Sequence, residues 1–271
     1  METKFEKNID INSNNYFVNM NGRNLLEFLL KKCDDMEVIK HVIEHSVESE
    51  FKENEMVFMI FKTGNIQLIN FVLDKNYDLN KINLYGKRWS PIHLLIFNNA
   101  KDDKLIKKLL KKKIILTDVT IDGFIPINLI FKNCNLTVIK YVFKNNLYDV
   151  TKNYEMDNSG FRPLQHLFVR KDLNLEFFKF LLNFEINFFE TNSLGWTSFH
   201  CIIFTQTKDM INLLLKKINL LKLKKIDVNA WLLNSNEYDD KFSIKLRTKD
   251  LIKFNNNLTD KEKKKLIKKF S

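Results

Sequence analysis

One cluster in the sequence has the residue types and spacing of a metal site, namely His41-Val-Ile-Glu44-His45. In the H-x-x-E-H pattern of inverted zinc peptidases, two histidines on one helical face bind zinc and the glutamate acts as the base. The helix expected here belongs to a series, and in its other members the position of His41 is filled by Phe71, Lys108, Tyr141, Phe180 and Leu213. We therefore interpret the cluster as part of a helix surface and expect no bound metal.

A cysteine nucleophile is a second possibility, because His200 directly precedes Cys201. Adjacent helical residues point about 100° apart, so these side chains would not face each other as a thiol and its base must. Cys33 and Cys134 lie far away in the sequence, and no C-x-x-C spacing suggests zinc or redox chemistry. The six glycines are too dispersed for a nucleotide-binding loop. We expect no catalytic residue and no cofactor, and hence a protein that is not an enzyme.

The composition is typical of a folded, helical protein. Of the 271 residues 45% are hydrophobic, whereas only six glycines and three prolines are present to make the tight turns of a β-sandwich. No run of about 18 apolar residues predicts a membrane span, and residues 1–10 do not resemble a secretory signal. We expect an intracellular, cytoplasmic protein, in the host cytoplasm if the source is a virus or an intracellular bacterium.

The net charge of +11 is concentrated in the C-terminal segment. Residues 241–271 contain eleven lysines and arginines against three acidic residues, which gives +8 and leaves +3 for the first 240 residues. The body of the chain is nearly neutral, so any electrostatic contact with an acidic surface is expected from this segment.

The three prolines and most of the glycines fall in one phase. Pro91, Pro126 and Pro163 are 35 and 37 residues apart, and Ser198 continues the series 35 residues later. Glycine allows a turn with positive φ, Ser or Thr caps a helix, and proline fits the first helical turn. Each aligned segment therefore predicts a turn followed by a helix start: Arg88-Trp-Ser-Pro-Ile-His93, Gly123-Phe-Ile-Pro-Ile-Asn128, Gly160-Phe-Arg-Pro-Leu-Gln165, Gly195-Trp-Thr-Ser-Phe-His200 and, in shorter form, Gly22-Arg-Asn-Leu-Leu-Glu27.

A second pattern follows these segments at the distance of a second helix. Its first, fourth and fifth positions are apolar, so they line one helical face that must be buried. Six occurrences predict six helix pairs: Ile39-Lys-His-Val-Ile43, Ile69-Asn-Phe-Val-Leu73, Ile106-Lys-Lys-Leu-Leu110, Ile139-Lys-Tyr-Val-Phe143, Phe178-Lys-Phe-Leu-Leu182 and Ile211-Asn-Leu-Leu-Leu215.

These two patterns resemble the ankyrin repeat, with its period of about 33 residues and its G-x-T-P-L-H helix start. Gly64 stands where that family turns between its two helices, and Asp227-Val-Asn-Ala230 resembles the end of a repeat. The resemblance covers about residues 20–230 and implies an all-α, ankyrin-type α-solenoid of about six helix-turn-helix repeats joined by hairpin-like loops. It also implies that His93 and His200 form hydrogen bonds to neighbouring backbone.

The expected organisation is a lead-in over 1–20, an array over 21–230 and a basic C-terminal cap or tail over 231–271. In this last segment Thr259-Asp-Lys-Glu262 fits a capping box, and Leu258, Leu266 and Ile267 are the apolar residues of the helix that follows. This helix either shields the last repeat or forms a ligand-binding tail. The approximate repeat boundaries are 21–52, 53–86, 87–121, 122–158, 159–193 and 194–230.

An aromatic residue follows the turn glycine, or its equivalent, in four successive units. In the ankyrin family this position lies near the tip of the hairpin finger, on the concave side where partners commonly dock. Two interpretations remain open, because the rings either form an exposed binding ladder or pack on one another. The candidate partner-binding residues are Trp89, Phe124, Phe161 and Trp196, with Arg23, Arg88 and Arg162 beside them.

The function expected from the resemblance is a non-enzymatic protein–protein interaction module, an adaptor or effector, that binds another protein on the concave or finger face. We expect a monomer without a transmembrane segment. The alternative is an electrostatic binder, in which the basic segment 241–271 contacts nucleic acid or an acidic membrane surface.

Overall fold

The computed structural model of the chain describes residues 25–45, 50–81, 88–152, 154–218, 230–232, 244–246 and 248–270. The expected lead-in over residues 1–20 lies outside these ranges. The chain divides into two compact units, with unit 1 formed by Met1–Ile115 and Val119–Ile121, and unit 2 by Leu116–Asp118 and Asp122–Ser271.

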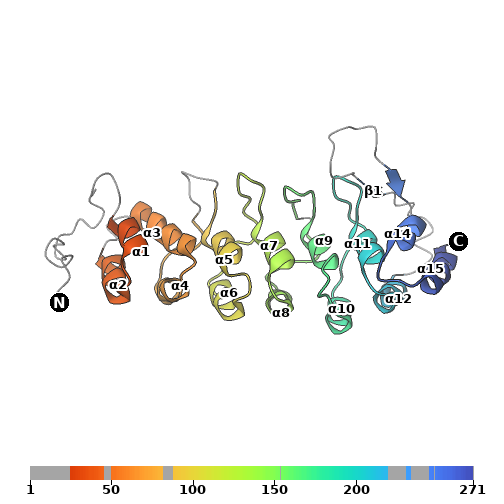
Figure 1. The fold of residues 1–271 in the computed structure, drawn as a ribbon, viewed down its shortest axis with the longest axis horizontal. Coiled ribbons are helices and arrows are strands. Elements are labelled where there is room, and N and C mark those ends of the chain that lie inside the picture. Colours follow the sequence, from red (N-terminus) through yellow and green to blue (C-terminus); the bar gives the residue numbers. More distant parts are fainter. Residues whose placement is uncertain are drawn as a thin grey trace. The chain divides into compact units, whose positions relative to one another are not determined.

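Unit 1 consists of helices that follow one another in pairs (Figure 1). The first helices, α1, α3 and α5, contact one another in sequence order, and so do the second helices, α2, α4 and α6. Each helix also contacts its pair partner, so unit 1 has two rows of helices. The bounds are α1 Leu25–Lys32, α2 Met36–His45, α3 Glu50–Thr63, α4 Ile66–Asp74, α5 Pro91–Asn99 and α6 Asp103–Leu110.

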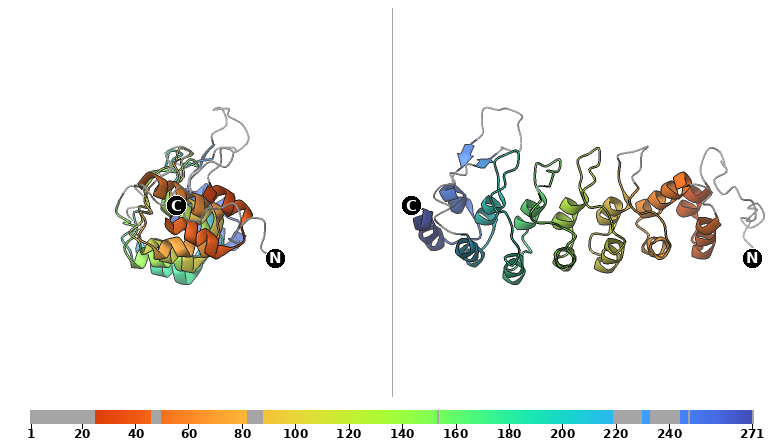
Figure 2. Two further views of the ribbon diagram at one scale, coloured as in Figure 1. Left: turned by 90° about the vertical axis from the view of Figure 1, so that its left-hand side faces the viewer. Right: turned by 180° about the vertical axis from the view of Figure 1, so that it is seen from behind.

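Unit 2 repeats this arrangement and adds a short strand ladder (Figure 2). Helices α7, α9, α11 and α14 contact one another in sequence order, and α10 contacts α12. The two strands are antiparallel, with Ala230 opposite Leu246, so the described chain is helical apart from this ladder. The bounds are α7 Pro126–Asn133, α8 Leu136–Lys144, α9 Pro163–Phe168, α10 Leu175–Leu181, α11 Ser198–Thr205, α12 Lys208–Lys217, β1 Ala230–Leu232, β2 Ile244–Leu246, α14 Thr248–Phe254, α15 Asp260–Ile267 and the 3₁₀ turn η2 Lys268–Phe270.

The predicted helix starts are confirmed at the proline positions. Proline is the first residue of α5, α7 and α9, and Ser198 is the first residue of α11. The residue three positions earlier has positive φ in all four cases, because glycine stands there three times with φ of 72–74° and Arg88 once with φ of 58°. Arg88 thus adopts a left-handed conformation that glycine adopts without steric cost.

The apolar face predicted for the second helices is buried. Positions one, four and five of the recurring pattern lie in the core in every helix, with Leu182 alone half-buried. Gly64, with φ of 70°, makes the turn between α3 and α4, and the Asn65 side chain caps α4 by accepting from the N–H groups of Gln67 and Leu68. The two sequence patterns therefore mark the elements that form the core.

The C-terminal segment contains a helix pair and is more than a single capping helix. Asn255, after α14, is fully buried and donates through Nδ2 to the carbonyl oxygens of Ile203 (2.8 Å) and Gln206 (2.9 Å) at the end of α11. Gln206 does the same one pair earlier, donating to the Phe168 oxygen of α9 (2.6 Å). Because α14 contacts α11 and α15 contacts α14, the two form a seventh pair within the described residues.

The boundaries of the pairs differ from the expected ones in two places. Helix α3 begins at Glu50, three residues before the expected start of the second unit at residue 53. The segment over 231–271 holds two helices, α14 and α15, where one helix is expected, and it also holds β2. Helix α15 starts at the predicted capping box, where Thr259 N–H donates to Glu262 Oε2 (2.9 Å).

The described helices include none that is long and apolar enough to cross a membrane.

Candidate protein-binding surface

The loops that precede α9 and α11 in unit 2 are held by an Asp and an Asn side chain, respectively. Asp157 accepts through Oδ1 from the N–H groups of Ser159 (3.0 Å) and Phe161 (3.2 Å), and its own N–H donates to the Phe161 oxygen (3.0 Å). Asn192 makes the equivalent contacts with the backbone of Trp196, at 2.9 Å through Oδ1 and 2.8 Å through its N–H. Each loop therefore fixes the backbone of the aromatic residue that follows its glycine.

Neighbouring loops of unit 2 are joined by the polar side chains that stand where His93 and His200 stand in the other recurring segments. Asn128 Nδ2 donates to the Phe161 oxygen of the next loop (3.0 Å). Gln165 accepts from the Arg162 N–H (2.9 Å) and donates through Nε2 to the Trp196 oxygen (2.7 Å). Both side chains are buried, so water does not compete for these hydrogen bonds of the side-chain amides. The hydrogen bonds therefore position one loop against the next.

The two histidines at this position are buried structural residues. His93 Nδ1 lies 3.2 Å from the N–H and 2.8 Å from the hydroxyl of Ser90, and His200 Nδ1 lies 3.1 Å from the same two groups of Thr197. Both side chains have no exposed surface. They complete the caps of α5 and α11, so the expected hydrogen bonds to nearby backbone are present.

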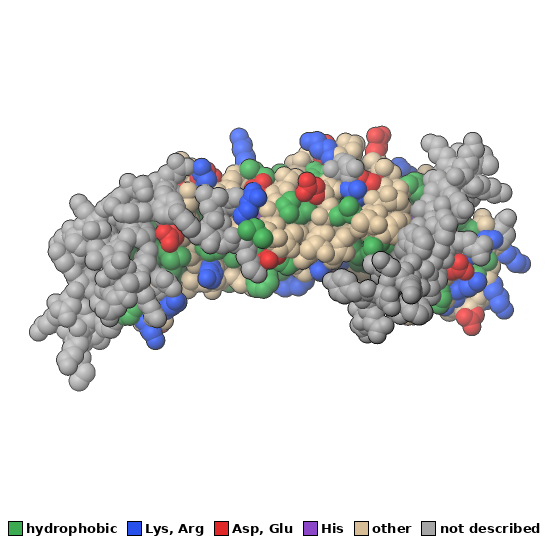
Figure 3. All heavy atoms as spheres, turned by 90° about the horizontal axis from the view of Figure 1, so that it is seen from above, with side chains coloured by type: hydrophobic (Ala, Val, Ile, Leu, Met, Phe, Trp, Pro, Cys, Tyr) green, Lys and Arg blue, Asp and Glu red, His purple; other side chains and the backbone are tan. Residues whose placement is uncertain are grey.

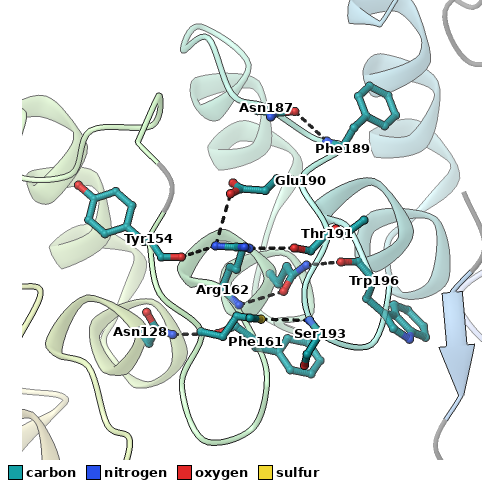
Figure 4. A network of polar contacts seen from close by, with 12 residues as sticks. Asn128, Tyr154, Phe161, Arg162, Asn187, Phe189, Glu190, Thr191, Ser193 and Trp196 are labelled. Carbon is teal, nitrogen blue, oxygen red and sulfur yellow. Dashed lines mark hydrogen bonds and ion pairs between the residues drawn. The ribbon is translucent and has the colours of Figure 1, made fainter. Parts of the chain in front are cut away.

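Arg162, one of the predicted partner-binding residues, is largely buried and contacts other groups of the protein. Its Nε donates to the Thr191 oxygen (3.0 Å), its NH1 donates to the Tyr154 oxygen, and Glu190 forms an ion pair with it at 3.4 Å (Figure 4). Only 16% of its side chain is exposed. The guanidinium thus links two loop segments, one at Tyr154 and one at Glu190 and Thr191, and a partner carboxylate would have to displace these contacts.

The predicted aromatic positions are occupied by rings that are at least half-buried. Trp196 is 8% exposed and packs against His200 and Phe204 of its own helix, with ring centroids 6.1 and 5.6 Å apart. Phe124 and Phe161 are half-buried, and the Phe161 ring lies 5.3 Å from that of His166. Packing on the same helix therefore accounts for Trp196 and partly for Phe161, and a fully exposed ladder of four rings is not formed.

One exposed aromatic surface is centred on Phe97 in unit 1, and Phe254 in unit 2 is also exposed. The Phe97 side chain is 71% exposed, and its ring meets that of half-buried Trp89 edge to face at 5.5 Å. Arg88, directly before Trp89, is exposed, whereas Arg23 lies outside the described residues. Arg88, Trp89 and Phe97, which we call the Trp89 surface, combine two rings and one cation.

Phe97 was not among the residues predicted from the sequence. Helix α5 is apolar at six of its first seven positions, and Pro91 to Ile96 are all buried. Such a run gives no polar face by which the solvent side could be recognised. The available signal was the spacing, because Phe97 comes eight residues after Trp89, as Phe204 comes eight after Trp196.

A buried Asp–His pair in unit 2 also escaped the sequence patterns. His166 Nε2 lies 2.6 Å from Asp157 Oδ2, and the two side chains are 6% and 7% exposed. Burial works to raise the pKa of Asp157, but hydrogen bonds from His166 and Ser159 outweigh it and hold that pKa at about 2. The pair faces no cavity that the structure shows, so we assign it to holding the loop.

The other residues that were considered for metal binding or catalysis form an ion pair or are buried. Glu44 accepts a hydrogen bond from Lys75 Nζ (2.6 Å), which links α2 to the end of α4. Burial raises the pKa of the Cys201 thiol to about 12, so the thiolate is absent at neutral pH. No group of three potential metal ligands occurs within the described residues.

The described surface in the view of Figure 3 is mixed in character. Hydrophobic, basic and acidic side chains lie close to one another on this surface (Figure 3).

In comparisons with known proteins, no protein-family model matches the chain and no curated protein matches its sequence. A function is therefore inferred from the geometry and chemistry of the side chains.

Proposed function

We propose that this chain is a non-enzymatic protein–protein interaction module of the ankyrin type, an adaptor or effector whose partner docks on the Trp89 surface. The helix pairs, the turn–proline junctions and the polar side chains that join neighbouring loops support the ankyrin arrangement. In such a stack each pair buries its apolar face against its neighbours, which leaves the loop side free to bind.

The main support for the proposed function is the exposed side chain of Phe97. A phenylalanine side chain that is 71% exposed leaves apolar area in water, and covering such area is worth about 25 cal/mol per Å². Aromatic residues with a cation beside them are typical of the residues that dominate protein interfaces. Trp89 supports the Phe97 ring from one edge, so a partner meets a surface that is already ordered.

The electrostatic alternative receives less support. Its segment, 241–271, holds helices α14 and α15, which pack on the preceding pair, and Lys269 Nζ donates to Asn212 Oδ1 of α12 (2.9 Å). The described lysines of this segment therefore belong to a folded surface. Folded basic surfaces also attract phosphate groups, but the exposed aromatic ring of Phe97 favours a protein partner.

Affinity capture with a single substitution tests the proposal. The full-length chain and its Phe97→Ser variant serve as bait, and Ile66→Ser is the matched control because Ile66 is also exposed, at 44%, at the start of α4 in the same unit. We expect Phe97→Ser to lower partner recovery about tenfold or more, while Ile66→Ser retains it. Equal recovery with all three baits would contradict a partner site at Phe97.

A further inference from the structure

A groove of about 750 Å³ lies between α12 and α15 in unit 2. This volume is within the range of ligand sites in proteins. The groove is lined by five lysines from α12, α15 and η2, and no acidic side chain is among its described lining residues. The lysines are Lys208, Lys216, Lys217, Lys265 and Lys269.

Three of these lysines carry uncompensated charge. Lys208 forms an ion pair with Glu262 at 3.5 Å, and Lys269 donates to Asn212. Lys216, Lys217 and Lys265 are exposed, and none is paired with a carboxylate in the part of the chain that the structure describes. Three like charges around one groove favour an acidic occupant.

The apolar part of the groove, its floor, consists mainly of lysine stems. Leu215, Ile218 and Leu266 also line the groove, but they are 4%, 8% and 2% exposed, so the aliphatic stems of the lysines supply most of its apolar surface. A segment that fits must present acidic groups to the rim and an apolar side chain to the floor. Helix α12 has ten residues, so the groove has room for a segment of roughly 15 Å.

The donors in the groove distinguish between acidic ligands. Sites that recognise phosphate groups commonly use arginine forks or backbone N–H groups, and sites for single-stranded nucleic acid add aromatic rings for stacking. Neither arginine nor an aromatic residue is among the described lining residues. A membrane surface is broad and flat, whereas this site is concave.

We propose that the groove between α12 and α15 binds an acidic peptide segment of a partner protein, with aspartates and glutamates on the ammonium groups of Lys216, Lys217 and Lys265 and an apolar side chain on the lysine stems beside Leu215 and Leu266. This site is distinct from the Trp89 surface, which belongs to unit 1. A partner could therefore be bound at the groove even if the Trp89 surface has no role.

The binding assay uses the full-length chain and a fluorescein-labelled synthetic peptide, Asp-Glu-Leu-Asp-Leu-Leu-Glu-Asp, followed by fluorescence anisotropy. A second peptide has serine in place of each leucine. An oligothymidylate of the same net charge and vesicles containing phosphatidylserine represent the other classes of acidic ligand. We expect the leucine peptide to bind at least about fivefold more tightly than each of the other three.

The matched variants separate the groove from the overall charge. Lys216→Glu/Lys217→Glu/Lys265→Glu removes the three unpaired lysines of the groove, and Lys261→Glu/Lys264→Glu/Lys268→Glu makes the same charge change at exposed positions outside its lining. We expect the groove variant to weaken peptide binding roughly tenfold or more and the control variant to weaken it less than about threefold. Far-UV circular dichroism establishes that both variants remain folded.

Three results would overturn the proposal. Equal weakening by the two triple variants would show that overall charge alone attracts the peptide. Equal affinity for the leucine and serine peptides would remove the apolar floor from recognition. Tighter binding of the oligonucleotide or of the vesicles would assign the groove to a different class of ligand.

Discussion

Single side chains in unit 2 set how the loops are held. Asp157 accepts three kinds of hydrogen bond, from backbone N–H groups, from the Ser159 hydroxyl (2.6 Å) and from His166 (2.6 Å). At the equivalent position Asn192 makes the backbone contacts, but its buried Nδ2 has no hydrogen-bond partner. The residue nine positions later is His166 in the first case and Cys201 in the second, which explains why only Asp157 finds a side-chain partner.

Asp157→Asn is expected to destabilise the protein in a pH-dependent way. The pKa of Asp157 is lowered from 3.8 to about 2, so its contribution is complete above about pH 4 and is lost as the pH falls through 2. Solvent screening at the loop reduces the effect, and we expect a loss of about 1 kcal/mol at pH 7. Urea unfolding at pH 7 and pH 2.5 measures it, with Glu155→Gln as an exposed control. A difference between wild type and variant that is as large at pH 2.5 as at pH 7 would refute this role.

At the scale of elements, each first helix in unit 2 has its carboxyl end capped by a polar side chain from the next pair. Arg170 donates to the Phe131 oxygen of α7 (2.9 Å), Gln206 to the Phe168 oxygen of α9, and Asn255 to two oxygens of α11. These bonds satisfy carbonyl groups that a helix end leaves without partners. The pair of α14 and α15 is therefore joined to the preceding pair by the same kind of contact that joins the earlier pairs of unit 2.

Asn255→Ala is expected to weaken the docking of the C-terminal pair. The substitution removes two buried hydrogen bonds and leaves the carbonyl oxygens of Ile203 and Gln206 without their donor, which costs about 1–3 kcal/mol. The exposed neighbour offers a control, Asn256→Ala, which should change stability by less than about 0.5 kcal/mol. Urea-induced unfolding measures both, and equal stability of the two variants would argue against the cap.

The sequence predicts the helices and their buried faces better than it predicts which side chains are exposed. Helix starts and buried faces follow from local rules that act within one element, such as the positive φ before Pro126 and the apolar spacing around Ile139. The internal position of Arg162 depends on the neighbouring loop, which brings Glu190 and the Thr191 oxygen to it, and no local pattern encodes that approach. Helix α14 was missed as a first helix because neither glycine nor proline marks its start.

At the scale of the molecule, the chain consists of two units in which each helix pair contacts its neighbours in sequence. Such a design leaves the surface residues of each pair free to specialise. In unit 1 the surface residues form the Trp89 surface, which we propose as the partner site. In unit 2 they form the groove between α12 and α15. The pattern of the repeats predicts the framework, whereas the exposure of Phe97 became evident only from the packing of α5.

Site-specific photo-crosslinking tests most directly whether a partner docks on the Trp89 surface. A benzophenone amino acid replaces Phe97 in one protein and Ile66 in another, and both are irradiated in cell extract under the same conditions. The proposed function predicts one discrete crosslinked product from position 97, absent from position 66 and suppressed by an excess of unmodified chain. Products from position 66 alone, or no product from position 97 while the partner is still captured, would contradict it.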